Sequence, residues 1–334
     1  MKKIVRDEVL ESSYVAIADD RGNQVTYKEL AEKAVEISRY VNTRSLIFVL
    51  CDHHSETLAF IYKILYLNIV PLLLPQDMDI ELAVRLLERY QPQYIYCNRN
   101  HTLSGMYGCT MEFREHALYR TEAPDCPVHP DVALLLSTSG TTGSAKLVKI
   151  SYDNLYDNAK YGCIHLGIQS GQKALSPLPF HYAYGISFCV WHWHCGATVL
   201  TTEKPVISRE FQEFYIRERV NNFAATPYTY QILQKLQFWS PEKLDALHFA
   251  ISSGAQMTEK EQRALISVMK EKFWIGYGQT ECIGILLGTN FNENDIKIGS
   301  VGRPFDNVKV IKDAETGEMQ IERRCVCMGY ANTR

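Results

Sequence analysis

The feature that most constrains this chain is an apolar run that ends in a loop made only of hydroxyls and glycines. Residues 132–136 are all apolar and of strand length, and residues 137–143 are Ser, Thr or Gly throughout. Such a loop cannot pack a core, but its glycines let successive backbone N–H groups converge on an anion. Lys146 adds a positive charge and opens a second strand-like run. The sequence therefore predicts a polyphosphate-binding loop between two strands.

Two other interpretations of this loop are open. A P-loop kinase or ATPase would need the Walker pattern GxxxxGK[ST] followed by a helix, whereas this chain lacks the pattern and continues as a strand. A flexible surface loop rich in Ser, Thr and Gly is the second alternative. Without a helix dipole, the grip on phosphate must come from backbone amides, hydroxyls, Lys146 and a metal ion.

Residues 138–146, TSGTTGSAK, resemble the phosphate-loop signature of the acyl-adenylating (AMP-forming) superfamily of acyl-CoA synthetases, firefly-luciferase-like enzymes and peptide-synthetase adenylation domains. Ala145 stands where the family usually has Pro, and Leu147 where it usually has Gly. Both positions shape the backbone outside the phosphate-facing part, so the expectation of nucleotide binding stands. Four further segments are similar to family motifs, in the family's order: 177–187, 252–257, 276–281 and 299–304.

The resemblance implies an α/β fold in which two packed, parallel-type sheets and their helices form a layered αβαβα domain, plus part of a small β-barrel-like subdomain. We expect a first α/β subdomain at 1–130, a second with the phosphate loop and nucleotide site at 131–284, and a partial β-rich subdomain at 285–334. The family continues with a TGD segment, a hinge and a C-terminal domain, which this sequence lacks. We expect a shortened chain or a truncated relative that binds nucleotide weakly and adenylates poorly.

Local patterns agree with alternating helices and strands. Thr26 and Thr258 each begin a capping box, and Ser151 is the expected N-cap of another helix. Residues 98–130 hold three prolines and no clear period, so they are predicted to connect two subdomains. Strands are predicted at 46–50, 70–74, 94–97, 146–150, 174–176, 197–201, 223–226, 247–252, 273–277, 308–311 and 319–321.

The family motifs imply a nucleotide site with a metal ion. Lys146, Thr280, Glu281 and His181 are the expected catalytic residues, and Glu281 is a hard oxygen ligand suited to Mg²⁺. Small residues at 254–255 leave room for a flat purine. The residues expected to contact the nucleotide are Thr138, Ser139, Gly140, Thr141, Thr142, Gly143, Lys146, Ser253, Gly254, Ala255, Gly276, Tyr277, Gly278, Gln279 and Thr280.

The motif at 177–187 implies a pocket for the acid. A donor on His181 would orient the incoming carboxylate, and the alternative is a histidine packed between aromatic neighbours. Amino-acid-activating relatives typically carry an aspartate in this motif, and none occurs between residues 177 and 190. We therefore expect a fatty or aromatic acid without an α-amino group. The residues expected to contact the acid are His181, Tyr182, Tyr184 and Gly185.

The reaction implied is acid plus ATP giving acyl-AMP and pyrophosphate, with Mg²⁺ and Lys146 lowering the repulsion between the carboxylate and the phosphates. In the family, the acyl group usually passes to coenzyme A or to the phosphopantetheine of an acyl carrier protein. A second hypothesis is a binding or regulatory module that keeps the nucleotide fold without turnover.

Composition narrows the partners and the setting. A net charge of −3 is too mild to predict nucleic acid as a partner. The most apolar stretch, 59–74, contains Lys63, Asn68 and Pro71, so no membrane insertion is expected. The 10 cysteines lack a CxxC pair, which predicts a reduced, cytoplasmic protein without disulfides. The WHWHC run at 191–195 is predicted to be packed core, because no ligand pair with zinc spacing accompanies it.

Overall fold

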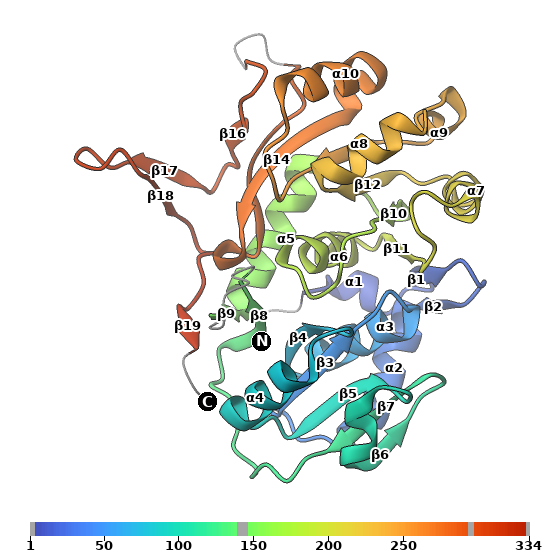
Figure 1. The fold of residues 1–334 in the computed structure, drawn as a ribbon, viewed down its shortest axis with the longest axis vertical. Helices are drawn as coiled ribbons and strands as arrows, with labels where there is room; N and C mark the ends of the chain where they lie inside the picture. Colours follow the sequence, from blue (N-terminus) through green and yellow to red (C-terminus); the bar gives the residue numbers. More distant parts are fainter. Residues whose placement is uncertain (1–3, 139–145, 293–296, 332–334) are drawn as a thin grey trace.

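The computed structural model describes residues 4–138, 146–292 and 297–331, and it shows a mixed α/β fold built on two large sheets (Figure 1). The lower sheet in Figure 1 has eight strands in the order β19-β9-β8-β4-β3-β5-β7-β6. Strands β5, β3, β4 and β8 are parallel neighbours, and the outer pairs are antiparallel. The strands are β3 (Leu46–Cys51), β4 (Val70–Pro75), β5 (Tyr94–Asn98), β6 (Gly108–Glu112), β7 (His116–Arg120), β8 (Val132–Ser137), β9 (Leu147–Ser151) and β19 (Tyr330–Ala331).

The upper sheet has nine strands in the order β16-β15-β14-β13-β12-β10-β11-β1-β2. Its centre, from β1 to β14, is parallel, and β2, β15 and β16 add antiparallel edges. The strands are β1 (Val15–Asp19), β2 (Gln24–Thr26), β10 (Lys173–Leu175), β11 (Thr198–Thr201), β12 (Asn222–Ala225), β13 (Phe249–Ser252), β14 (Phe273–Gln279), β15 (Gly284–Thr289) and β16 (Arg303–Pro304).

Helices cover both sheets and fill the space between them. Apolar side chains of α2 (Tyr27–Ser38), α3 (Ser55–Tyr66), α5 (Tyr152–Leu166) and α6 (Ala183–Cys195) share one core with strands of both sheets. Helix α4 (Ile80–Tyr90) packs on the outer face of the eight-stranded sheet. Helices α7 (Arg209–Glu218), α8 (Pro227–Lys235) and α10 (Glu259–Met269) pack on the outer face of the nine-stranded sheet. The expected αβαβα layering is therefore present, with the short helices α1 (Asp7–Leu10) and α9 (Pro241–Asp245) beside it.

The predicted helix starts form as their side chains dictate. Thr26 and Thr258 each accept a hydrogen bond from the backbone N–H three residues on, and the glutamate at that position bonds back to complete a capping box. Ser151 forms the same reciprocal pair with Asn154 at the start of α5. These starts were predictable because each cap is satisfied within a single turn.

Residues 98–130 are more ordered than the sequence indicated. They contain the hairpin β6–β7, which extends the eight-stranded sheet at its edge through β5. Strand β6 has no fully buried residue, so it lacks the alternation by which a strand is predicted. The prediction that this stretch only connects subdomains is wrong for residues 108–120.

Strand pairing also crosses the predicted subdomain boundary near residue 130. Strands β1 and β2 lie in the nine-stranded sheet, where β1 pairs with β11. Strands β8 and β9 lie in the eight-stranded sheet, where β8 pairs with β4. The two sheets thus exchange elements, which ties the halves together. The proposed division at 1–130, 131–284 and 285–334 stays a prediction.

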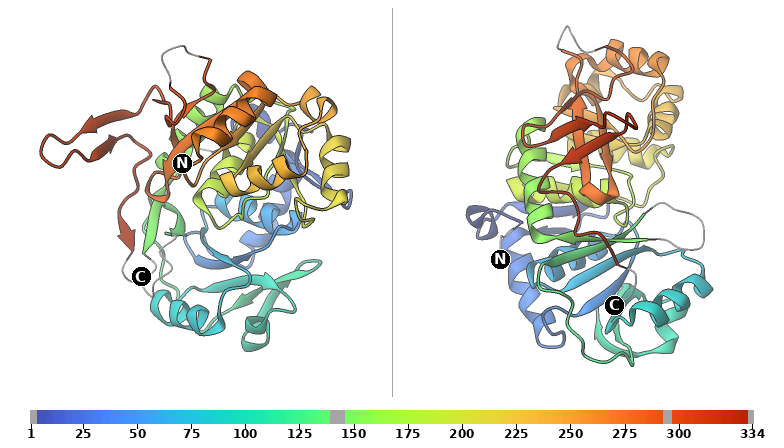
Figure 2. Two further views of the ribbon diagram at one scale, coloured as in Figure 1. Left: turned by 45° about the horizontal axis from the view of Figure 1, so that its top comes forward. Right: turned by 90° about the vertical axis from the view of Figure 1, so that its left-hand side faces the viewer.

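Residues after β16 form a small antiparallel unit, as the turn pattern indicated. Strands β17 (Lys309–Lys312) and β18 (Met319–Glu322) form a two-stranded hairpin that projects from the body of the protein (Figure 2). The chain then returns, and β19 pairs with β9 in the other sheet. This return places residues 327–331 beside the mouth of the predicted phosphate loop.

One cysteine prediction is corrected. The structure pairs Cys163 of α5 with Cys195 at the end of α6 as a disulfide, with Cα atoms 6.9 Å apart. The two residues are 32 positions apart, and only the packing of α5 against α6 brings them together.

In the described part of the chain, every helix is too short or too polar to cross a bilayer.

Candidate nucleotide and acid site

The predicted motif residues gather at one edge of the nine-stranded sheet. Because β12, β13 and β14 are parallel, the residues that follow their carboxyl ends lie side by side. Thr226 follows β12, Ser253 and Gly254 follow β13, and Thr280 follows β14 in the short helix η3 (Thr280–Cys282). Ligands of open α/β sheets bind at this edge, so the fold brings two separate motifs to a position suited to a ligand.

The base of the phosphate loop is closed by a hydrogen bond. The Thr138 amide donates to the Lys146 carbonyl oxygen at 3.1 Å, just beyond the ends of β8 and β9. Lys146 is exposed at the mouth of the loop. The other predicted loop residues lie outside the described residues: Ser139, Gly140, Thr141, Thr142 and Gly143.

Tyr330 joins the phosphate-loop lysine to the predicted metal ligand. Its hydroxyl donates to Glu281 Oε1 at 2.8 Å, and Lys146 Nζ lies 5.0 Å from the centre of its ring. The Cys327 amide donates to the Glu281 carbonyl oxygen at 2.7 Å, which fixes the returning segment against η3. Two motifs more than 130 residues apart in the sequence therefore meet through Tyr330.

Tyr330 was missed by sequence reasoning. It is absent from the expected site residues, because an isolated tyrosine carries no pattern that predicts its partner. The signal that was present is the Gly-Tyr pair at 329–330, because Gly329 has φ +91° and turns the chain onto β9.

Gly278 is required by a close approach of two backbones. A Cβ atom at this position would lie 1.8 Å from the Gly284 carbonyl oxygen, within the β14–β15 hairpin. The pairing register shifts between Tyr277 and Gly278, so a bulge turns the end of β14 toward the site. Beyond it, the side-chain Nε2 of Gln279 donates to the Tyr277 hydroxyl at 2.9 Å. The glycine thus allows the turn that carries Thr280 and Glu281.

The turn after β13 is open where a purine was expected. Ser253 is buried, whereas Gly254 and Ala255 are exposed. Gly254 has φ +89°, and a Cβ there would approach Tyr184 Cδ1 at 4.0 Å. Tyr184 is held by its hydroxyl, which donates to the Ile251 carbonyl oxygen at 2.9 Å. The predicted adenine turn and one predicted acid-pocket residue are therefore neighbours.

His181 lies two residues before α6, and one of its ring nitrogens has no hydrogen-bond partner among the described residues. Its Nδ1 is buried, and no group among the described residues bonds to it. Burial lowers the pKa of His181 to about 4, against a smaller opposing effect of Asp77. The imidazole is therefore neutral at pH 7 and offers one donor and one acceptor. Its neighbour Tyr182 is exposed, with the two rings 4.5 Å apart.

Gly185 is required by a close approach of two backbone segments. A Cβ atom there would lie 2.1 Å from the Pro179 carbonyl oxygen, so only glycine allows the first turn of α6 to fold against the preceding segment. This contact positions His181 and Tyr182 and does not itself show contact with an acid.

The residues present suit Mg²⁺ only together with a phosphate ligand. Within residues 4–138, 146–292 and 297–331, no group of three His, Cys, Asp or Glu residues is arranged to hold a metal ion. Glu281 supplies one carboxylate at the site, and Mg²⁺ commonly binds one or two carboxylates plus substrate phosphates.

His192 and His194 are buried and bonded to the Phe188 and Ile4 carbonyl oxygens, which confirms the prediction that they are core residues.

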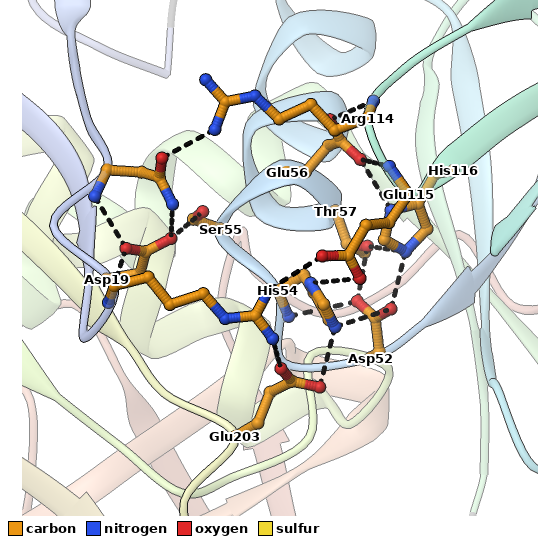
Figure 3. Close-up of polar contacts among 12 residues, drawn as sticks. Asp19, Asp52, His54, Ser55, Glu56, Thr57, Arg114, Glu115, His116 and Glu203 are labelled. Atoms are coloured by element: carbon orange, nitrogen blue, oxygen red, sulfur yellow. Dashed lines mark hydrogen bonds and ion pairs between the residues drawn. The ribbon is translucent and has the colours of Figure 1, made fainter.

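A separate polar cluster lies at the junction of the two sheets (Figure 3). His116 on β7 is fully buried between Asp52, whose Oδ2 is 2.6 Å from Nε2, and Glu56, whose Oε2 is 2.8 Å from Nδ1. His54 approaches Glu203 at 2.7 Å on the other side of Asp52. No family motif named above includes these residues, so we do not place the cluster in the candidate site.

Comparisons with known proteins agree with the fold and the motifs. Residues 9–331 match the family described as AMP-binding enzyme. The chain is 25% identical to tyrocidine synthase 2 of Brevibacillus parabrevis over 92% of its own length and 9% of that protein. It is 30% identical to an uncharacterized acyl-CoA ligase of Bacillus subtilis (strain 168), over 57% of this chain and 36% of that protein.

Solved structures show the same fold. Apo MatB from Rhodopseudomonas palustris superposes with a TM-score of 0.81 at 16% identity, over 97% of this chain and 69% of that chain. The o-succinylbenzoate CoA synthetase MenE of Bacillus subtilis gives 0.77 at 19% identity, over 96% and 68%. The chain spans 9% and 39% of the first two curated relatives, which are longer proteins. With its phosphate-loop strands, motif order and matched length, the chain belongs to the AMP-binding enzyme family.

Proposed function

We propose that this protein activates a carboxylic acid with ATP, giving acyl-AMP and pyrophosphate. The observation that carries the proposal is the meeting of Lys146 and Glu281 through Tyr330 at the edge where β13 and β14 end. A cation for phosphates and a carboxylate for a divalent ion are the two charges that the reaction needs at one place.

In this reaction a carboxylate oxygen forms a bond to the α-phosphorus, and the bond from that phosphorus to the bridging oxygen of pyrophosphate breaks. Lys146 would bind phosphate oxygens and draw negative charge away from the attacking carboxylate. Thr280, which precedes Glu281 in η3, offers a hydroxyl donor. Glu281 would hold Mg²⁺, which supplies charge neutralisation on the triphosphate when bound.

The acid would be oriented by His181, Tyr182 and Tyr184. A neutral imidazole at His181 can donate a hydrogen bond to a carboxylate without forming a salt bridge that traps it. No aspartate lies between residues 177 and 190 to pair with an ammonium group, which favours a fatty or aromatic acid. The acyl group would then pass to coenzyme A or to carrier-protein phosphopantetheine. The name of one relative, D-alanine–D-alanyl carrier protein ligase, supports the second acceptor as an alternative.

The test is ATP–pyrophosphate exchange with a panel of acids, including aliphatic, aromatic and amino acids. We expect exchange that depends on a fatty or aromatic acid and is lost in Glu281→Gln, while the exposed control Glu318→Gln retains it. Release of ADP and phosphate would indicate a kinase or ATPase instead. Nucleotide binding without exchange for any acid would favour the non-catalytic module.

A further inference from the structure

A cavity outside the candidate site lies along helix α5, where the chain enters and leaves the β17–β18 hairpin. Its volume is about 330 Å³, which is within the range of small-molecule sites. One face of α5 forms the first wall and contributes Asp157, Lys160 and Tyr161. Asn307, just before β17, and Arg324, just after β18, form the opposite wall.

A buried ion pair lies directly beneath this cavity. The side chain of Arg323 is fully buried, and its Nε donates to Asp157 Oδ2 at 3.0 Å. The Arg323 guanidinium lies 5.4 Å from the centre of the Tyr161 ring. Its Nη1 is buried, and no acceptor among the described residues bonds to it. Because Asp157 and Tyr161 both line the cavity, an unsatisfied cationic donor lies just behind the cavity wall.

Asn307 supplies an unsatisfied acceptor to the same cavity. Its Nδ2 donates to Asp157 Oδ2 at 2.8 Å, and because an ionised carboxylate only accepts, this bond fixes which way the Asn307 amide is turned. Its Oδ1 is buried, and no donor among the described residues bonds to it. A buried acceptor without a donor costs free energy, so a ligand that donates a hydrogen bond to Asn307 would be stabilised.

Two cations at the mouth of the cavity also lack an anion. Lys160 and Arg324 are exposed, and among the described residues neither has a carboxylate oxygen within 4.0 Å. Of the two carboxylates in the lining, Asp157 is already compensated by Arg323, and Asp153 lies exposed at the rim. Positive charges therefore outnumber negative charges in and beneath the cavity, which favours an anionic ligand.

We propose that this cavity binds a small phosphate monoester whose body carries a hydroxyl group. The phosphate would accept hydrogen bonds from Lys160 and Arg324, since lysine and arginine are the usual protein partners of phosphate. The hydroxyl would donate to Asn307 Oδ1, which a fully ionised phosphate ester or a carboxylate cannot do. The inference does not depend on the proposed adenylation, because Lys146 and Glu281 do not line this cavity.

The test is a calorimetric titration of glycerol phosphate into the whole chain, with propyl phosphate as the matched ligand that lacks hydroxyls. We expect Lys160→Met and Arg324→Met each to weaken the binding of glycerol phosphate at least about tenfold. The control Lys235→Met, at an exposed lysine of α8, should change this affinity less than about twofold. Propyl phosphate should bind the unmodified protein about fivefold more weakly than glycerol phosphate, because it makes no hydrogen bond to Asn307. No binding of glycerol phosphate, or equal affinity for the two esters, would overturn the proposal.

The predicted phosphate loop would also attract a phosphate ester, so Lys146→Gln separates the two sites. The affinity for glycerol phosphate should be unchanged in Lys146→Gln. An affinity that is lost in Lys146→Gln and kept in Lys160→Met would place the ligand at the candidate site, which overturns this inference and leaves the proposed function standing. Lys160 and Arg324 are exposed, so both variants should fold. Should either variant unfold, the comparison of the two esters in the unmodified protein decides.

Discussion

The hydroxyl of Tyr330 donates to Glu281 at 2.8 Å, while the ring of the same tyrosine lies 5.0 Å from the Lys146 ammonium. One side chain on a two-residue strand therefore contacts both charges of the candidate site. The hydrogen bond to Glu281 raises the pKa of Tyr330, which keeps the hydroxyl protonated as the donor. Any cation that binds Glu281 Oε1 must compete with this hydroxyl.

Tyr330→Phe should strengthen the response to Mg²⁺. The change removes one hydrogen bond to a carboxylate, worth about 0.5–1.5 kcal/mol at a partly exposed position, and frees the oxygen for the metal. The Mg²⁺ concentration for half-maximal ATP–pyrophosphate exchange should fall by roughly two- to tenfold. Tyr14→Phe, at another exposed tyrosine, is the control. An unchanged midpoint would show that the Tyr330 hydroxyl does not compete with the metal, and a higher midpoint would show that it assists metal binding.

Lys146→Gln should abolish most exchange without unfolding the protein. The side chain is exposed and makes one cation–π contact, so the melting temperature should change little. Loss of the charge that binds phosphate should lower the exchange rate by about 10²-fold or more. Lys149→Gln, three residues along β9, should keep the rate within about threefold. Equal rates in the two variants would remove Lys146 from the reaction.

The stability of the protein should depend on pH through His116. Burial by itself would lower the pKa of His116, but hydrogen bonds with Asp52 and Glu56 outweigh it and raise the pKa to about 9. A pKa raised above the unfolded value of about 6.5 stabilises the fold fully below that pH, and the effect is lost as pH rises through about 9. The contribution is on the order of 3 kcal/mol.

His116→Gln therefore should lose about 2–4 kcal/mol of unfolding free energy at pH 6, since it removes the cation that lies between the partly buried carboxylates of Asp52 and Glu56. The difference between the two proteins should shrink by pH 9.5. Urea unfolding at both pH values measures it. His129→Gln, at an exposed histidine, should show no such pH dependence. A constant difference across this range would mean that His116 is neutral in the folded protein.

Gly278→Ala should damage both stability and the site. The added methyl would lie 1.8 Å from a backbone oxygen of Gly284, which cannot move without breaking the hairpin. We expect a loss of at least about 2 kcal/mol and reduced exchange, because Thr280 and Glu281 follow the same turn. Gly108→Ala, where a Cβ meets nothing within 4 Å, is the control. A melting temperature equal to that of the control would contradict the close approach.

The parts of this fold that sequence reasoning predicted are those set by short-range chemistry. The capping boxes at Thr26 and Thr258 are satisfied three residues away, and buried strands such as β3 and β8 are continuous apolar runs. The motif residues Lys146, Ser253, Thr280 and Glu281 were identified in the same way, as patterns along the chain. Their roles in binding and catalysis remain predictions.

Tertiary structure alone decided how these parts meet. The pairing of β1 with β11 and the hydrogen bond from Tyr330 to Glu281 each join residues far apart in the sequence. The burial of Lys63 likewise depends on how the elements pack. Backbone hydrogen bonds between strands are alike for every sequence, so the sequence of a strand does not determine which other strand it pairs with. The partner is chosen by which packing buries both sheets and their helices at once, and that choice belongs to the whole chain.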